Sequence, residues 1–136
     1  MAVKAAARAI ALAKKLAMKP KQRIIVRRCP SELQDDFRSL GAAFDRGTIA
    51  ELTLSFVRMQ HEIENACKEA IALTAPGGVL WMAYPKKSGE IESDLSRDTG
   101  WEPFVRAGWR PVSQISIDET WSALRFKPIE DVKKRS

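Results

Sequence analysis

The sequence predicts an α/β fold with a mostly parallel sheet of about five strands and a C-terminal antiparallel hairpin. Short β-branched or apolar runs alternate with helical patterns, an order that gives right-handed crossovers and a parallel sheet. The run 79–84 is apolar throughout, as expected for a central strand that is covered on both faces. The runs 112–117 and 121–126 are separated only by the polar residues 118–120, so we expect a hairpin there.

The other elements follow from periodicity and from the residues that end helices. They are a helix over 3–17, a strand within 23–28, a helix over 31–40, a strand over 51–57, a helix over 60–74 and a short helix around 98–108. Pro20 ends the first helix, and Ser31 with Gln34 matches a capping box for the second. The Ala75-Pro76-Gly77-Gly78 segment predicts a turn after the long helix.

The charge is concentrated at the N-terminus. Residues 1–28 hold nine basic and no acidic residue, whereas the chain as a whole has a formal net charge of +6. We therefore expect a basic, Ala-rich arm over 1–20 that is separable from an α/β domain over 21–128, followed by a charged tail over 129–136. The arm could contact nucleic acid through residues 4–28 or act as a transit segment, but a solvated helix is the favoured interpretation.

Composition excludes several classes of protein. No apolar run approaches the roughly 20 residues of a membrane span, so none is expected. Two cysteines and one histidine, His61, are too few for a disulfide scaffold or a zinc site, and we expect no metal. Reduced thiols and a cytoplasmic location are predicted. Cys67 lies on the apolar stripe of the long helix, which favours an inert core thiol.

A candidate site follows from the ends of the predicted strands, because ligands of open parallel sheets bind at the carboxyl edge. Lys86 and Lys87 follow the most apolar strand, and the hairpin turn is expected at the same edge. The candidate cluster comprises Lys86, Lys87, Ser88, Asp94, Arg97, Asp98, Asp118, Trp121 and Arg125.

Two interpretations of this cluster stay open. Paired lysines beside a glycine could hold a phosphate or a carboxylate. Alternatively, ion pairs with aspartates tie the long loop over 85–97 to the sheet. We predict that Lys86 and Lys87 point to different sides, and that at least one lies within ion-pair distance of Asp94, Asp98 or Asp118.

Several motifs carry a family resemblance. LTAPGGVLWMAYPKK resembles a late helix–PGG–strand element of S-adenosylmethionine-dependent methyltransferases, and the stretch from GWEPFVRAGW through the hairpin resembles the end of that fold. Over nearly its whole length the chain also resembles a family of short bacterial proteins without an assigned activity, through LAKKLAMKP, YPKKSG, DLSRD, GWEPF and SIDETWSALRF. The resemblance implies a truncated, methyltransferase-like Rossmann fold.

Two departures from those enzymes bear on the cofactor. The first strand ends in Arg27-Arg28-Cys29-Pro30, without the glycines that let a backbone approach a cofactor, and the family's second strand is missing. We therefore expect no cofactor, and S-adenosylmethionine is disfavoured.

The function predicted from the sequence is a non-catalytic or degenerate domain that binds a small anion or a protein partner. One alternative is an active enzyme with an unusual cofactor pocket at the same edge. Another is a nucleic-acid-binding accessory protein that acts through its basic arm.

Overall fold

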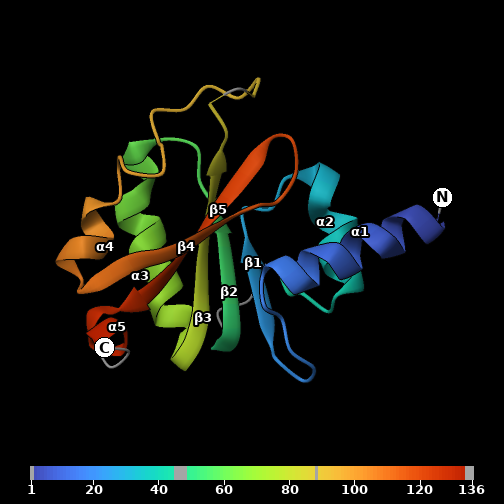
Figure 1. Ribbon diagram of the computed structural model, residues 1–136, viewed down its shortest axis with the longest axis horizontal. Helices are drawn as coiled ribbons and strands as arrows, with labels where there is room; N and C mark the ends of the chain where they lie inside the picture. Colours follow the sequence, from blue (N-terminus) through green and yellow to red (C-terminus); the bar gives the residue numbers. More distant parts are fainter. Residues whose placement is uncertain (1, 45–48, 88, 134–136) are drawn as a thin grey trace.

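The structure is a computed structural model that describes residues 2–44, 49–87 and 89–133 (Figure 1). Its helices are α1 (Ala2–Lys15), α2 (Ser31–Ser39), α3 (Ile63–Leu73), α4 (Glu102–Arg106) and α5 (Ile129–Lys133), with a 3₁₀ turn, η1 (Gln60–Glu62), before α3. Its strands are β1 (Ile24–Arg27), β2 (Ala50–Phe56), β3 (Thr74–Pro85), β4 (Trp109–Ser116) and β5 (Trp121–Pro128). No helix in the described part of the chain is long and apolar enough to cross a membrane.

The five strands form one sheet in the order β1-β2-β3-β5-β4. β1, β2 and β3 are parallel, whereas β5 runs antiparallel to both β3 and β4. The predicted α/β fold with its C-terminal hairpin is confirmed. At the outer edge of β1, Ala43 makes a single parallel bridge with Ile25, so the strand expected to be missing is reduced to one residue pair.

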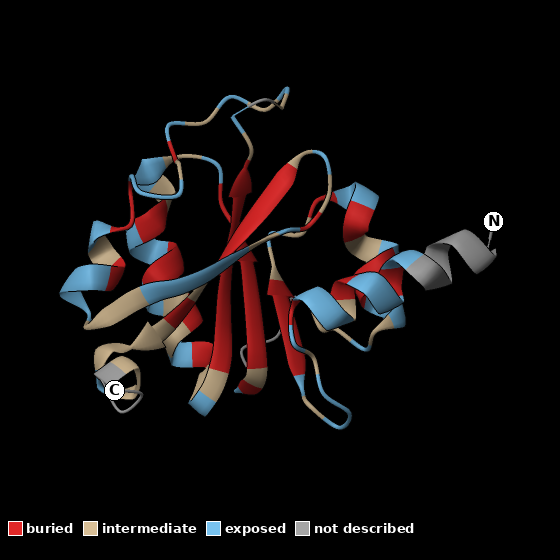
Figure 2. Cartoon of the chain, in the orientation of Figure 1, coloured by how far each residue is buried: buried red, intermediate tan, exposed pale blue. Residues whose placement is uncertain are grey.

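Helices cover both faces of the sheet. Leu33 and Phe37 of α2 pack with residues of α1 on one face, and Ile63 and Ala66 of α3 pack with Phe104 of α4 on the other. Buried residues dominate the three central strands in Figure 2. Even the polar face of β2 is buried, because α3 covers Thr53 and Ser55.

The N-terminal helix belongs to this core, which corrects the prediction of a separable arm. Leu12 of α1 and Leu16, just beyond it, are 2% and 0% exposed and lie in the same cluster as the sheet residues. The indole Nε1 of Trp81 donates a hydrogen bond of 3.0 Å to the carbonyl oxygen of Leu16. The basic residues lie on one side of the helix, and apolar residues at helical spacing on its other side, including Ala9 and Leu12, are buried.

Two local predictions are wrong for physical reasons. α2 begins after Pro30 without a side-chain cap, because the Gln34 amide donates to the Cys29 carbonyl instead. The predicted turn at 75–78 is part of β3, which has a bulge where the register with β2 shifts. Gly78 is needed there, since a Cβ would lie 2.8 Å from the carbonyl oxygen of Glu51.

We predict that Leu16→Ala lowers the free energy of unfolding by about 2–5 kcal/mol, because it leaves a cavity in the core. Ile10→Ala is the matched control on α1, where the side chain is 58% exposed, and should change it by no more than about 0.5 kcal/mol. Urea unfolding measures both variants. Equal unfolding midpoints for Leu16→Ala and the parent chain would contradict the placement of this segment in the core.

Candidate functional site

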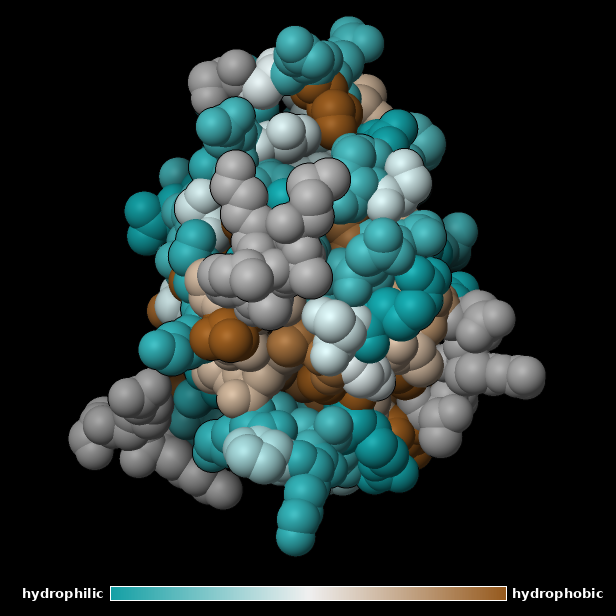
Figure 3. All heavy atoms as spheres, turned by 90° about the vertical axis from the view of Figure 1, so that its right-hand side faces the viewer, coloured by the Kyte–Doolittle hydropathy of each residue, from teal (hydrophilic) through white to brown (hydrophobic). Residues whose placement is uncertain are grey.

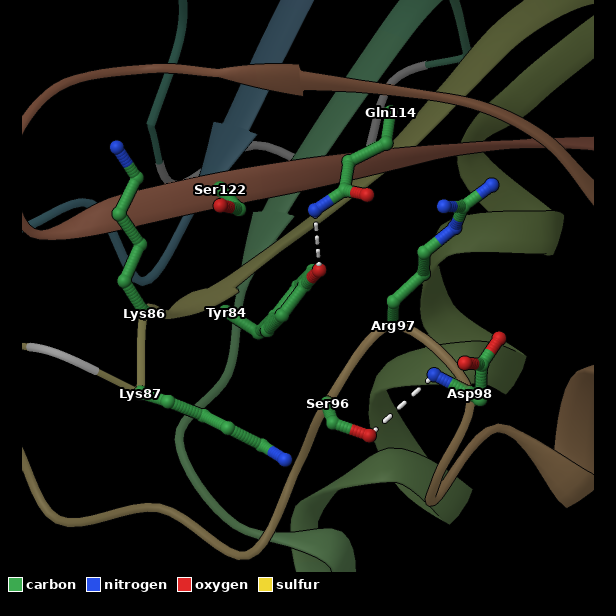
Figure 4. Close-up of a pocket in the computed structure, with 8 residues that line it drawn as sticks. All are labelled: Tyr84, Lys86, Lys87, Ser96, Arg97, Asp98, Gln114 and Ser122. Atoms are coloured by element: carbon green, nitrogen blue, oxygen red, sulfur yellow. Dashed lines mark hydrogen bonds between the residues drawn. The ribbon is translucent and has the colours of Figure 1, made fainter.

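A pocket of about 430 Å³ lies at the carboxyl end of β3, between the following loop and the β4–β5 hairpin (Figure 4). We call it the carboxyl-edge pocket. Its lining residues are Tyr84, Lys86, Lys87, Ser96, Arg97, Asp98, Gln114 and Ser122. The pocket therefore combines cations from the loop with hydroxyl and amide groups from the sheet.

The centre of the pocket is built by Tyr84 and Gln114. The Gln114 amide donates a hydrogen bond of 2.8 Å to the phenol oxygen of Tyr84, as Figure 4 shows. The Tyr84 ring packs edge-on against Trp101, with ring centroids 5.6 Å apart. Burial raises the pKa of Tyr84, so the phenol keeps its proton at neutral pH and can donate it to a ligand in a hydrogen bond.

The lysines follow one prediction and depart from another. Figure 4 shows Lys86 and Lys87 pointing to different sides, as expected. The Lys86 ammonium donates a hydrogen bond of 2.7 Å to the hydroxyl of Ser116. Within the described residues, however, no ion pair joins either lysine to Asp94, Asp98 or Asp118, so the predicted pairing is wrong.

Two of those aspartates are engaged by backbone donors instead. The Asp94 carboxylate accepts a hydrogen bond of 2.7 Å from the backbone N–H of Gln60, which ties the loop to η1. The Asp118 carboxylate accepts hydrogen bonds of 2.8 Å from Thr120 and Trp121 and shapes the hairpin turn. Such local side-chain-to-backbone bonds compete with ion pairs for carboxylate oxygens.

The predicted cluster is therefore only partly assembled. Lys86, Lys87, Arg97 and Asp98 line the carboxyl-edge pocket. Trp121 is buried on the opposite face of the sheet, edge-on to Phe56 with ring centroids 5.0 Å apart. Arg125 lines a separate pocket near the start of β3. Ser88 lies outside the described residues.

Sequence reasoning missed four lining residues: Tyr84, Ser96, Gln114 and Ser122. Tyr84 and Ser122 are directly paired across β3 and β5, so they reach the same face of the sheet. The strand boundaries and the antiparallel hairpin were both predicted, and aligning them would have found this pair.

A smaller hollow of about 210 Å³ lies at the carboxyl ends of β1 and β2, on the α1–α2 side of the sheet. We call it the strand-end hollow, and it is lined by Arg28, Phe56, Arg58, Glu62 and Trp121. Arg28 has a φ of 57°, a conformation usually left to glycine. Its guanidinium donates a hydrogen bond of 2.9 Å to Glu69 of α3 and so covers the end of β1.

Part of the basic N-terminus is engaged within the fold. Arg8 forms an ion pair of 2.7 Å with the buried Asp36, and the Lys15 ammonium donates to the carbonyl of Ser116. Figure 3 views the α1–α2 end of the molecule, where hydrophilic residues surround a band of hydrophobic ones. These contacts leave fewer cations of the arm for an external partner.

Comparison with known proteins supports the fold. No family model and no curated protein matches the chain. Among solved structures, the ribosomal protein L11 methylase of Lactobacillus delbrueckii subsp. bulgaricus has 7% identity and a TM-score of 0.55, over 92% of this chain and 78% of the other. NSun6 of Pyrococcus horikoshii with SFG has 11% identity and a TM-score of 0.60, over 90% and 52%. The DhpI–SAH complex has 12% identity and a TM-score of 0.51, over 93% and 84%.

These neighbours show a Rossmann-like, methyltransferase-like fold, and they correct the expectation of no cofactor. One of them is solved with SAH, the demethylated form of S-adenosylmethionine, so a neighbour of this fold holds a ligand of the kind that was not expected. That expectation rested on the absence of glycines from Arg27-Arg28-Cys29-Pro30, the turn after the first strand. Identities this low show the fold alone.

We predict that both thiols react slowly in the folded chain. Burial, more than the nearby carboxylate of Glu32, raises the pKa of Cys29 to about 12, and burial raises the pKa of Cys67 to about 11. Because the thiolate is the reactive form, alkylation by iodoacetamide at pH 8 should be at least about tenfold slower than in the urea-unfolded chain. Native labelling of Cys29 at the unfolded rate would contradict its half-buried position.

Proposed function

We propose that the chain is a methyltransferase-like domain, non-catalytic or catalytically degenerate, that binds a small anionic ligand in the carboxyl-edge pocket. One observation carries the proposal: Lys86, Lys87 and Arg97 line the pocket without an ion-pair partner among the described residues. Three cations beside a single carboxylate, that of Asp98, give the pocket a positive balance. A phosphate or carboxylate would reduce their mutual repulsion.

The pocket also favours a ligand with a neutral polar part. The Tyr84 hydroxyl is an available donor, and the amide oxygen of Gln114 is a potential acceptor beside it. A volume of about 430 Å³ falls within the range of roughly 300–1,000 Å³ that small-molecule sites occupy. These features suit a small phosphorylated or carboxylated compound that also carries hydroxyl groups.

We expect Lys87→Ala and Arg97→Ala each to weaken anion binding about tenfold, because a charge-assisted hydrogen bond contributes about 1.5–3 kcal/mol. Both side chains are exposed, so the fold should tolerate their removal. Calorimetric titration with inorganic phosphate, glucose 6-phosphate and AMP measures the affinities. Lys14→Ala, an exposed lysine of α1, is the control. The proposal fails if no probe binds, or if all three variants weaken binding equally.

A second candidate function is binding of S-adenosylmethionine in the strand-end hollow, supported by the SAH-bound neighbour. Arg58 suits the carboxylate of the cofactor's amino-acid end, whereas Arg28 is already paired with Glu69. The rings of Phe56 and Trp121 offer an apolar wall. The Glu62 carboxylate accepts backbone hydrogen bonds of 2.6 Å from Arg58 and 3.4 Å from Met59, so part of its capacity is already used. At about 210 Å³ the hollow is smaller than the roughly 300–1,000 Å³ of small-molecule sites, so it would hold only one end of the cofactor.

We expect S-adenosylhomocysteine to bind and Arg58→Ala to weaken that binding about tenfold, through loss of a charge-assisted contact. Arg106→Ala is the matched control, since it removes an exposed arginine whose one ion pair among the described residues is with Glu64 of α3. Calorimetry measures both. Binding that is unaffected by Arg58→Ala would place the compound elsewhere and contradict this assignment.

A further inference from the structure

A third cavity, of about 300 Å³, lies at the opposite edge of the sheet, where β2 and β3 begin. We call it the amino-edge pocket. It is lined by Ala17, Lys19, Gln22, Glu51, residues 76–79 and Arg125. None of these residues lines the carboxyl-edge pocket or the strand-end hollow. Its two cations, Lys19 and Arg125, have no role in the function proposed above.

Arg125 is the unusual member of this group. It projects from β5, where it is paired with Trp81 of β3, and its side chain is half-buried. Its Nε is buried and has no hydrogen-bond partner, and no ion pair joins its guanidinium to a carboxylate within the described residues. A guanidinium carries five donors and stays charged at any physiological pH, so placing it here without an acceptor is costly.

The carboxylate that lines the pocket does not compensate this charge. Glu51 also lines the pocket, but it is held by Arg23, whose backbone N–H donates to it at 2.7 Å and whose Nε donates at 3.1 Å. These bonds lower the pKa of Glu51 to about 2, so it stays ionised and paired with Arg23. The charges of Lys19 and Arg125 are therefore left uncompensated in the pocket.

Another wall of the pocket is formed by residues 76–79, two of which are glycines. Gly77 has a φ of 76°, and Gly78 is so close to the start of β2 that a Cβ would approach the Glu51 carbonyl to 2.8 Å. Gly78 therefore serves the close packing of β3 on β2, whereas the space beside Gly77 is open, so that its main chain can be approached by a ligand. On the facing side, Ala17 and Lys21 are non-glycine residues with φ of 60° and 69°, which bend the chain between α1 and β1 around Lys19.

We propose that the amino-edge pocket binds the oxyanion group of a small phosphorylated or carboxylated molecule, with Arg125 as its main partner and Lys19 as the second. The planar guanidinium matches two oxygens of a phosphate or a carboxylate, and an ammonium adds a point charge. The volume of about 300 Å³ lies at the lower end of small-molecule sites, so the ligand is small.

The test uses the full chain and a site-resolved readout. Inorganic phosphate is titrated into ¹⁵N-labelled protein, and acetate in a parallel arm distinguishes a phosphate from a carboxylate ligand. We expect saturable shifts at the Gly77 and Gly78 amides and at the Arg125 Nε–Hε signal, whose burial protects it from exchange with water. Shifts at these signals that never saturate, or no shifts with either anion, would overturn the proposal.

Variants separate this pocket from the other two. Arg125→Met keeps the apolar stem and should abolish the shifts at Gly77 and Gly78. If that variant does not fold, Lys19→Ala on the exposed loop should weaken them about tenfold. Lys14→Ala and Lys87→Ala should leave them unchanged.

The outcomes for the two anion sites are independent. Loss of the glycine shifts in Lys87→Ala would mean that the anion acts from the carboxyl edge, which would refute the amino-edge site and leave the earlier proposal intact. Conversely, the Gly77 and Gly78 shifts could persist in Lys87→Ala while the calorimetric affinity for anions is also unchanged. That result would support the amino-edge pocket and not the carboxyl-edge pocket.

Discussion

The structure depends on the double burial of β3. This strand is parallel to β2 on one side and antiparallel to β5 on the other, so the direction of the strands reverses between β3 and β5. Trp81 faces the α1–α2 cluster, whereas Leu80 and Met82 face the α3–α4 cluster. Both hydrophobic cores therefore meet on one strand, and its backbone hydrogen bonds are sheltered from water on both faces.

The indole of Trp81 shows how this burial controls the N-terminus. A buried indole N–H needs an acceptor, and here the acceptor is the carbonyl of Leu16, just after α1 ends. That bond fixes where the chain leaves α1, and the residues that follow then bend toward the start of β1. The loop beside the amino-edge pocket thus takes its path from a hydrogen bond in the core.

Much of the fold was predictable because the strands follow simple patterns. The apolar run 79–84 and the alternation over 51–57 located the two central strands, and the polar residues 118–120 located the hairpin turn. The position of Arg125 was predicted less well. β5 runs away from the carboxyl edge, and Arg125 lies four residue steps after Trp121, which corresponds to about 13 Å along a strand. Hairpin direction and strand rise together would have placed Arg125 near the opposite edge.

The lysine pairing failed for a different reason. Composition shows which charges are available, but it does not show that turn amides engage Asp94 and Asp118 first. When a loop becomes ordered, its backbone N–H groups lose water and each needs an acceptor nearby. A lysine on a flexible stem has no such need, because its ammonium can remain in water. Predictions of ion pairs near tight turns therefore need to count backbone donors before side-chain cations.

The shortened first edge of the sheet explains why the end of β1 has little open space in this chain. Within the part of the chain that the structure describes, Ala43 alone extends the sheet beyond β1. The arginines at the end of β1 bind Glu69 of α3 rather than leaving an open turn. What remains above β1 and β2 is the strand-end hollow of about 210 Å³. Two larger cavities, of about 430 and 300 Å³, border the two ends of β3, where the hairpin and the α1–β1 loop provide walls. In this chain, therefore, both ends of β3 border a cavity, whereas the end of β1 is closed by its arginines.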